Sequence, residues 1–345
     1  MKNIAIFFGW IGLDKDKNTN GPSIGAKYLL QGLLKYSKYN DNIDFYTKSC
    51  YDQDIKHNLK RYTYNDITME FINKYEIIHV VNDIQTALII SNFTDNIILG
   101  PNVIFSYPCT NIKRKISKFP YLKEKILLEE ELCNKQFNVI LICNNDLLHL
   151  YEKRIKKYNK ILSFPYGVNT EVFQPNTKIN REFITSVVPS DKKGLSLLTK
   201  ARKLLPEELQ SKWIFYDEIN KYEHGSEKHL NILQTTKIFV SGSAYETQGL
   251  ASFEALSCGC PVIICDYTYK RDNDDNISIF EPVYFNSNMS IIVKRDPNLI
   301  AEKIIELFND NEKINEMSIV SRKYIVDNFS LEIMSNNYDK IIDTI

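Results

Sequence analysis

Long apolar runs and paired cysteine motifs are both missing from this sequence of 345 residues. No stretch reaches the roughly 18–20 apolar residues that cross a bilayer. The apolar residues 4–10 lead into the charged residues 14–17, so we expect no signal peptide. The seven cysteines include no C-x-x-C pair. These absences predict a soluble, cytoplasmic protein whose thiols are reduced and buried.

A net charge is missing as well, because 43 Lys and Arg residues balance 43 Asp and Glu residues. Proteins that coat nucleic acid normally carry excess positive charge, so this is not expected to be the main function, although local basic patches remain possible. The length favours two domains, since one domain usually has roughly 100–200 residues. With 43% hydrophobic residues, each half can form a core, which excludes general disorder.

Buried strands alternate with amphipathic helices along both halves of the chain, which predicts mostly parallel sheets covered on both faces. In the first half we expect strands at 3–8, 43–47, 77–81, 97–105, 139–143 and 161–165, and helices after 21–25 and at 67–74, 84–91, 121–134 and 146–158. In the second half we expect strands at 183–188, 213–216, 238–241 and 262–265, and helices at 195–205, 250–257, 299–308, 314–328 and 331–345.

The alternation stops near Pro165, Gly167 and Pro175, which mark an interdomain linker. The predicted fold class is therefore α/β, with two doubly wound domains that face each other across a cleft. The expected bounds are 1–166 for the first domain, 167–178 for the linker, 179–328 for the second domain and 329–345 for a final helix.

The most informative segment is 241–262, which reads S-G-S-A-Y-E-T-Q-G-L-A-S-F-E-A-L-S-C-G-C-P-V. Gly249 lets the backbone approach a ligand, and the amides of Leu250 and Ala251 open a helix whose positive end can bind phosphate. Glu246 lies in the loop and Glu254 on the first turns of the helix, so the two carboxylates can hold opposite ends of one ligand. The alternative is a surface loop and a packed helix with two solvated acids.

With these residues the chain resembles the retaining GT-B glycosyltransferases of family four, which carry an E-x7-E motif. Glu246 and Glu254 match that motif. Three further segments are similar to the family: Phe164-Pro-Tyr-Gly-Val-Asn-Thr-Glu-Val-Phe173, Lys193-Gly194 followed by Leu197, Leu198 and Ala201, and Arg322-Lys-Tyr-Ile with Asn328-Phe-Ser and Tyr338. The last of these resembles a closing helix that crosses back onto the first domain.

The resemblance implies a GT-B fold and a hexosyl- or pentosyltransferase. The donor would be a nucleoside diphosphate sugar, most simply a UDP-sugar, and the sugar would pass with retention of configuration to an acceptor hydroxyl. Neither a metal nor another cofactor would be required. The acceptor could be a glycan, a lipid or a modified nucleic acid base.

The same resemblance assigns roles to single residues. Glu246 would hold the donor sugar as a catalytic residue, and Glu254 would hold the ribose. Lys193 would neutralise the charge that develops on the leaving diphosphate. The expected donor-binding residues are Ser23, Gly25, Lys192, Lys193, Thr247, Gln248, Gly249, Leu250, Ala251 and Glu254.

One residue departs from the family pattern in the second domain. The family has an arginine about five residues before the lysine, and Val188 stands there. Lys192 could compensate, but lysine and arginine are not equivalent at a phosphate site.

The first domain matches the family less closely. The loop Gly21-Pro-Ser-Ile-Gly25 stands where the family has a glycine-rich loop, and Ser23 and Gly25 would approach the diphosphate or the acceptor. His79 and Asn102 are the candidates for a catalytic group near the sugar, and Asn82 could add a polar contact at a strand end. For His79 a role in the core is an open alternative, and for the loop so is simple helix capping.

Basic residues Lys113, Arg114, Lys115 and Lys118 form an expected acceptor surface in the first domain. Together with a second basic stretch at 153–160, they could bind an anionic membrane surface or nucleic acid, or they could be a solvated helix face. The D-x-D within residues 272–275 is a weak metal signal, and we expect no metal site.

Two other functions stay open from the sequence. One is a nucleotide-sugar epimerase or hydrolase on the same fold. The other is a non-catalytic protein that binds a nucleotide sugar or a polyanion, which Val188 favours.

Overall fold

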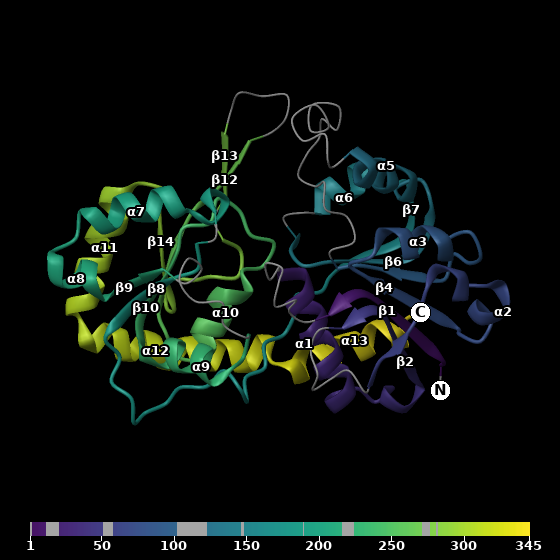
Figure 1. Ribbon diagram of the computed structural model, residues 1–345, viewed down its shortest axis with the longest axis horizontal. Helices are drawn as coiled ribbons and strands as arrows, with labels where there is room; N and C mark the ends of the chain where they lie inside the picture. The colour runs from purple at the N-terminus through teal and green to yellow at the C-terminus, as the bar shows by residue number, and fades with distance from the viewer. Residues whose placement is uncertain are drawn as a thin grey trace. The chain divides into compact units, whose positions relative to one another are not determined.

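The computed structural model divides into two compact units (Figure 1). The first unit holds Met1–Gly167 and the C-terminal Leu331–Ile345, and the second holds Val168–Lys270 and Asn276–Ser330. The structure describes residues 2–11, 21–50, 58–101, 123–145, 148–188, 190–215, 224–270, 277–280 and 282–345.

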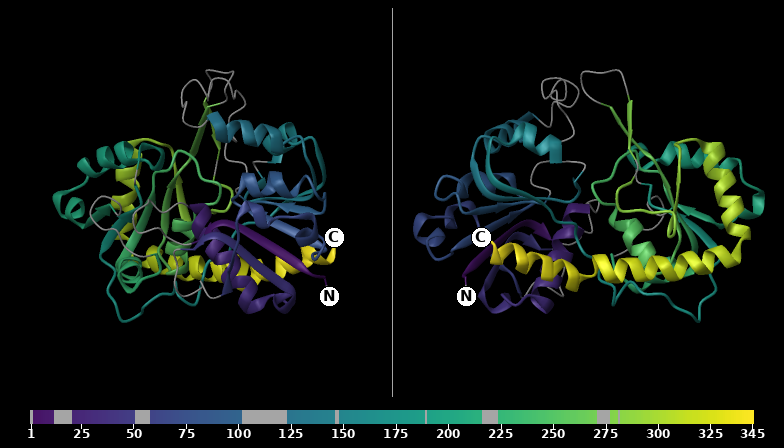
Figure 2. Two further views of the ribbon diagram at one scale, coloured as in Figure 1. Left: turned by 45° about the vertical axis from the view of Figure 1, so that its right-hand side comes forward. Right: turned by 180° about the vertical axis from the view of Figure 1, so that it is seen from behind.

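The first unit is built on a seven-stranded parallel sheet with the strand order β3-β2-β1-β4-β5-β6-β7. Helices α1 and α13 lie on one face of this sheet, and α3 and α5 lie on the other (Figures 1 and 2). Its strands are β1 (Ile4–Ile11), β2 (Ile43–Cys50), β3 (Lys60–Arg61), β4 (Ile77–Val81), β5 (Ile97–Leu99), β6 (Gln136–Ile142) and β7 (Lys157–Ser163). Its helices are α1 (Gly21–Tyr36), α2 (Met69–Ile72), α3 (Ile84–Ile90), α5 (Lys123–Leu132), α6 (Leu148–Arg154) and α13 (Leu331–Asp343).

The central strands are buried along almost their whole length, because helices cover both faces. Every residue of β4 is buried, and so is every residue of β1 except Trp10. Such strands read as continuous apolar runs, not as alternating ones. The chain starts at β1, adds β2 on one side and then returns to add β4 on the other, so the order of the strands reverses between β1 and β4.

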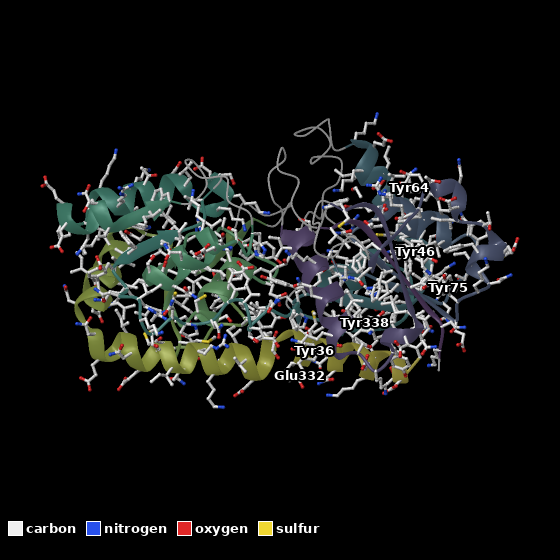
Figure 3. The ribbon with its side chains drawn as sticks, turned by 60° about the horizontal axis from the view of Figure 1, so that its bottom comes forward. Tyr36, Tyr46, Tyr64, Tyr75, Glu332 and Tyr338 are labelled. Atoms are coloured by element: carbon white, nitrogen blue, oxygen red, sulfur yellow. The ribbon has the colours of Figure 1, made fainter. Side chains whose placement is uncertain are left out.

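The last helix, α13, packs within the first unit, as the resemblance implies. The carboxylate of Asp339 accepts hydrogen bonds from the hydroxyl of Ser37 at 2.6 Å and from the amide of Lys38 at 2.9 Å. Tyr338, labelled in Figure 3, is fully buried beside His79. These contacts join the C-terminus of the chain to α1 and to the centre of the first sheet.

The second unit contains a five-stranded parallel sheet with the order β14-β11-β10-β8-β9. Helices α7 and α11 lie on one side of it, and α9, α10 and α12 lie on the other (Figure 1). Its strands are β8 (Phe183–Ser186), β9 (Trp213–Phe215), β10 (Thr236–Ser241), β11 (Val262–Cys265) and β14 (Ser290–Val293). Its helices are α7 (Leu195–Lys203), α8 (Glu207–Lys212), α9 (Glu227–Thr235), α10 (Leu250–Ser257), α11 (Pro297–Asn309) and α12 (Asn311–Phe329). A separate antiparallel hairpin joins β12 (Tyr267–Lys270) to β13 (Ile277–Phe280).

Helix starts in the second unit follow their local sequence. The side chain of Asp296 accepts from the amide of Asn298, and Pro297 occupies the first helical position of α11, where its missing N–H costs nothing. Asp310 accepts from the amide of Lys313 at 2.9 Å and starts α12 in the same way. No helix of the described residues is both long enough and apolar enough to span a membrane.

Three expected elements agree with the structure to the residue: the strands Ile77–Val81 and Val262–Cys265 and the helix Leu250–Ser257. The helix expected over 146–158 is wrong at its end, because α6 stops at Arg154 and β7 begins at Lys157. No residue of β7 is fully buried, since it is an edge strand, so it lacks the apolar run that marks a central one. Helices α8 and α9 and strand β14 were not expected.

Cysteine burial agrees with the expectation of structural thiols. Burial raises the pKa of the Cys133 and Cys260 thiols to about 11 and that of Cys265 to about 12. All three side chains are buried in the cores of their units.

Arg322 of α12 fixes the segment with which the chain enters the second unit. Its guanidinium donates to the carbonyl oxygens of Phe173 at 2.7 Å, Ser257 at 3.0 Å and Thr170 at 2.9 Å. The hydroxyl of Ser257 donates to the same carbonyl of Phe173. One side chain therefore satisfies backbone acceptors of two segments that are distant in sequence.

Replacing Arg322 should destabilise the protein. In Arg322→Met these carbonyl oxygens lose a charged donor, which should lower the free energy of unfolding by about 2 kcal/mol. Chemical denaturation of the full chain measures this change. Lys323→Met is the matched control, because Lys323 is 76% exposed and pairs with Asp327 one turn further along its own helix, so less than about 0.5 kcal/mol should be lost. Equal losses in both variants would contradict the assigned role of Arg322.

Candidate functional site

The candidate site lies at the carboxyl ends of β8 and β10, where the order of the second sheet reverses. The chain passes from β8 outward to β9 and then returns to place β10 on the other side of β8. The loops that follow β8 and β10 therefore leave in opposite directions, and open α/β sheets bind ligands at such a point. Lys193 follows β8, and Glu246 follows β10.

Lys193 and Glu246 form an ion pair across this point. The ammonium of Lys193 donates to Oε1 of Glu246, and the hydroxyl of Ser243 donates to the same oxygen at 2.6 Å. The side chain of Lys193 is 32% exposed and that of Glu246 is 17% exposed. Both charged groups are thus held in place while solvent can still reach them.

The surroundings of Glu246 keep its carboxylate charged. Burial alone would raise the pKa of Glu246. The charge and hydrogen bond of Lys193, the hydrogen bond from Ser243 and the charge of Lys192 outweigh burial and hold this pKa below its ordinary value. The rings of Tyr245 and Tyr267 are in edge contact at 5.8 Å, and burial together with the Glu246 charge raises the pKa of Tyr267.

Gly249 begins α10 in a conformation that suits glycine. Its φ of 86° and ψ of 53° place it in the left-handed region. The first hydrogen bond of this helix runs from the amide of Ser252 to the carbonyl of Gly249. The amides of Leu250 and Ala251 precede that bond, so the helix itself does not use them, and both residues are partly exposed. Thr247 is also partly exposed, whereas Gln248 is buried.

Glu254 lies deeper, on α10, and has a partner that sequence reasoning missed. Nε2 of His224 is 2.7 Å from Oε1 of Glu254, and the two side chains are only 7% and 5% exposed. His224 comes just before α9, and no motif in the sequence connects it to Glu254. A signal was nevertheless present, because a buried carboxylate requires a donor and few histidines are available in this unit.

One close backbone approach and one side-chain hydrogen bond hold the loop that carries Glu246. A Cβ atom added to Gly194 would lie 2.2 Å from the carbonyl oxygen of Gly242, and the φ of Gly194 is 92°. The same carbonyl accepts a hydrogen bond at 2.8 Å from Arg295, which follows β14. Arg295 was missed by sequence reasoning as well, because nothing local relates it to Gly242. The loop is therefore fixed from both of its neighbouring sides.

Val188 points into the hydrophobic core of the second unit and is fully buried. It therefore offers no polar group to a phosphate. Lys192, the expected substitute, is exposed, and its carbonyl accepts from the amide of Ala244 at 2.8 Å. Its charge contributes to lowering the pKa of Glu246, so it belongs to the electrostatic surroundings of the site.

In the first unit, the loop expected at 21–25 is wrong, because α1 already begins at Gly21, so Ser23 and Gly25 lie inside the first turns of this helix. Ser23 is 3% exposed, and a Cβ atom added to Gly25 would lie 2.5 Å from the ring of Tyr166. Close packing against Tyr166 thus requires a glycine at position 25, whatever its part in ligand binding.

Asn82 joins the ends of β1 and β4, where the first sheet reverses its order. Its side-chain oxygen accepts from the amide of Gly9 at 2.9 Å, and its side-chain nitrogen donates to the carbonyls of Trp10 and Pro22. The φ of Asn82 is 50°, a left-handed value that asparagine tolerates better than most residues. Asn82 therefore positions backbone at this edge and is itself buried.

His79 is fully buried, and both of its ring nitrogens have partners. Nδ1 is 3.1 Å from the hydroxyl of Tyr338, and Nε2 lies against the carbonyl of Gly100. Burial lowers the pKa of His79 to about 4. This environment favours the core role that the sequence left open for His79.

Other expected site residues lie outside the described residues. These are Asn102, the basic residues Lys113, Arg114, Lys115 and Lys118, and the D-x-D at 272–275. Within the described part of the chain, no group of His, Cys, Asp or Glu residues could hold a metal ion.

Comparison with known proteins gives a family match in the second unit and matches in fold over the chain. The family model described as glycosyl transferases group 1 matches residues 217–324. No curated protein matches the chain. Among solved structures, HepE of Anabaena in complex with UDP-glucose has a TM-score of 0.71 at 9% identity, covering 99% of this chain and 100% of that one. Sucrose-phosphate synthase of Thermosynechococcus elongatus has a TM-score of 0.67 at 13% identity, covering 99% of both chains. A glycosyltransferase of Rickettsia africae has a TM-score of 0.66 at 13% identity, covering 99% of this chain and 97% of that one.

These structural likenesses show that the fold is GT-B, so the fold expected from the sequence is confirmed. The family match in the second unit, which contains Glu246 and Glu254, supports a glycosyltransferase.

The ion pair predicts how the pKa of Glu246 responds to mutation. In Lys193→Met this pKa should rise, because the strongest opposing influence is lost while burial remains. Carbon-detected NMR titration of the glutamate carboxyls measures it, with Glu246→Gln used for assignment. The pKa of Glu208, which the hydrogen bond from Lys212 within α8 lowers, is the internal control and should not change.

The Lys193–Glu246 pair also makes a contribution to the free energy of unfolding that depends on pH. Because the folded-state pKa of Glu246 is below the unfolded value of about 4.3, the pair stabilises fully above that pH. Its contribution is lost as the pH falls through the folded-state pKa. The difference in unfolding free energy between native protein and Lys193→Met should therefore shrink in acid, and a difference that grows in acid would contradict the pairing.

Proposed function

We propose that the protein transfers a sugar from a nucleoside diphosphate sugar to an acceptor hydroxyl, with retention of configuration. The donor would bind to the second unit at the carboxyl ends of β8 and β10, and the acceptor would bind to the first unit. A UDP-sugar is the preferred donor class, because HepE, which shares the fold, has been solved with UDP-glucose.

The observation that carries this proposal is the Lys193–Glu246 pair beside the first amides of α10. A diphosphate needs positive charge and N–H donors, and a sugar needs acceptors for its hydroxyls. Lys193 and the amides of Leu250 and Ala251 provide the first set, and Glu246 provides the second. One elongated ligand can therefore satisfy both at a single point of the sheet.

Binding of the donor would give new partners to Lys193 and Glu246. Lys193 and Glu246 form an ion pair in which their charges neutralise each other. A bound diphosphate would become the second anionic partner of Lys193, whose ammonium has three donors. Glu246, still held by Ser243, would accept from sugar hydroxyls. Lys193, Ser243 and Glu246 are already held together by their hydrogen bonds, as a preorganised site requires.

The same groups would assist bond breaking. As the glycosidic bond breaks, negative charge accumulates on the leaving diphosphate, and Lys193 together with the helix amides stabilises it. This role is the one that a metal ion has in other transferases, so we propose that transfer is metal-independent. Attack of the acceptor on the face that the leaving oxygen has vacated would retain the configuration.

Glu254 would bind the ribose of the donor. It lies about one turn along α10 from the phosphate-binding amides, and its carboxylate accepts hydroxyl hydrogen bonds. The buried thiols of Cys133, Cys260 and Cys265 suit a reducing compartment, so a cytoplasmic location stays part of the proposal. We also propose that the first unit binds an anionic membrane or nucleic acid through its basic residues. This part of the proposal rests on the sequence.

A panel of nucleotide sugars tests the donor class. Thermal unfolding of the full chain with each donor should show a raised melting temperature for one nucleotide, because a ligand that binds only the folded state stabilises it. Slow hydrolysis of that donor, followed by NMR of the released sugar, then reports the anomeric configuration. Tight binding without turnover over an acceptor panel would favour a non-catalytic nucleotide-sugar-binding protein.

Mutation of the ion pair should impair transfer. Glu246→Gln and Lys193→Ala should each lower kcat by roughly 100-fold or more, because each removes a charge aimed at the reacting centre. Donor turnover, measured as released nucleoside diphosphate, is the readout. Glu208→Gln is the control, since Glu208 is an exposed acid of the same unit, and its turnover should equal that of the native protein. Unchanged turnover in Glu246→Gln or Lys193→Ala would show that the site assignment is wrong.

A further inference from the structure

We infer that His224 is a positioning residue that sets the carboxylate of Glu254 to recognise the ribose hydroxyls of the donor. The inference rests on the proposed function and adds to it a residue that the E-x7-E motif does not contain. It starts from the hydrogen bond between Nε2 of His224 and Oε1 of Glu254.

The bond places a hydrogen on Nε2 of His224. An ionised carboxylate only accepts hydrogen bonds, so the hydrogen between the two side chains belongs to Nε2. A carboxylate has about four lone-pair positions, and His224 uses one of them. By holding Oε1, the imidazole also sets the rotation of the carboxylate plane. Two adjacent ribose hydroxyls can be accepted only in a suitable orientation of that plane.

The ring of His224 is itself immobilised by aromatic neighbours. Phe173 contacts it with a ring separation of 5.6 Å, and His229 does so at 5.3 Å. Phe173 and His229 also contact each other, so the three rings form one cluster. We refer to Phe173, His224 and His229 as the aromatic cluster.

Hydrogen bonds anchor this aromatic cluster from behind. The carbonyl of Phe173 accepts from Ser257 and from Arg322. Nδ1 of His229 accepts from the amide of Gly225, and burial lowers the pKa of His229 to about 4, so this ring is neutral near pH 7. His224 therefore faces Glu254 from an anchored aromatic wall in which the neighbouring His229 is neutral.

A positioning role and a mere packing role of His224 predict different effects on nucleotide binding. If His224 merely fills space, its loss weakens binding of every nucleotide that enters the site. If it orients Glu254, its loss weakens only those contacts that Glu254 makes. The ribose 2′-hydroxyl isolates these contacts, because UDP and 2′-deoxy-UDP differ by that group alone.

The test measures Kd for UDP and for 2′-deoxy-UDP by calorimetry with the full chain. The native protein should prefer UDP by roughly ten- to a hundredfold, as expected for a hydrogen bond to a charged group. His224→Phe keeps a ring but removes the donor, and it should bring this ratio close to one while the Kd for 2′-deoxy-UDP stays within about twofold. His224→Gln places an N–H donor near the position of Nε2 and should retain most of the preference.

A double-mutant comparison separates His224 from Glu254. Glu254→Gln should also bring the ratio close to one, and adding His224→Phe to it should change nothing further, because both act through the same contact. If His224→Phe weakens UDP and 2′-deoxy-UDP equally, or changes neither, the inference is overturned. A Gln variant that loses the preference as completely as the Phe variant would also overturn it.

A measurement on the native protein covers the case in which the Phe variant does not fold. The Nε2 signal of His224, assigned with His224→Gln, should shift in nitrogen NMR when UDP binds and shift much less with 2′-deoxy-UDP. Equal shifts would contradict the inference. Failure of the proposed function is distinguishable, because in that case the native protein binds neither nucleotide, or Glu254→Gln leaves the preference unchanged.

Discussion

Two opposite charges meet where the second sheet reverses its strand order, and the rest of the candidate site is arranged around them. The loops after β8 and β10 diverge at this point, and each brings one charged side chain, Lys193 or Glu246. Neither charge is fully solvated, so each needs the other in the absence of ligand. The loops must also come close together, which is why Gly194, with no side chain, faces the carbonyl of Gly242.

The carboxylate of Glu254 also needs a partner, and this partner differs from that of Glu246 because Glu254 is more deeply buried. Glu246 is partly exposed and is paired with an ammonium, whereas Glu254 is 5% exposed and is bonded to an imidazole. Burying an ammonium at that depth would cost much of its hydration. A histidine donates a hydrogen bond in its neutral form as well, so it can satisfy a buried carboxylate without desolvating a positive charge. Depth therefore accounts for the choice between lysine and histidine.

The sequence predicts those parts of this arrangement that are local. Glu246, Gly249 and Glu254 fall within one loop and one helix, so their spacing alone places them near each other, and the strands around them are apolar runs that are easily recognised. His224 is 30 positions from its partner and follows no repeat, so only the folded chain shows the contact. For His79 the sequence left a catalytic role and a core role open, because burial is a tertiary property that the local sequence does not show.

The arginine that the resemblance expects at position 188 is missing, but another arginine, Arg295, holds the backbone of the site loop. The resemblance expects an arginine at position 188, yet Val188 adds to the core instead. Arg295, which follows β14, reaches the same edge of the sheet. Its guanidinium donates to the carbonyl of Gly242, one residue before Ser243. Arginine forms such directional bonds better than lysine does. The loop is thus fixed by contacts from β8 and from β14 before any ligand arrives, and a ligand that binds a preformed loop loses less affinity to ordering it.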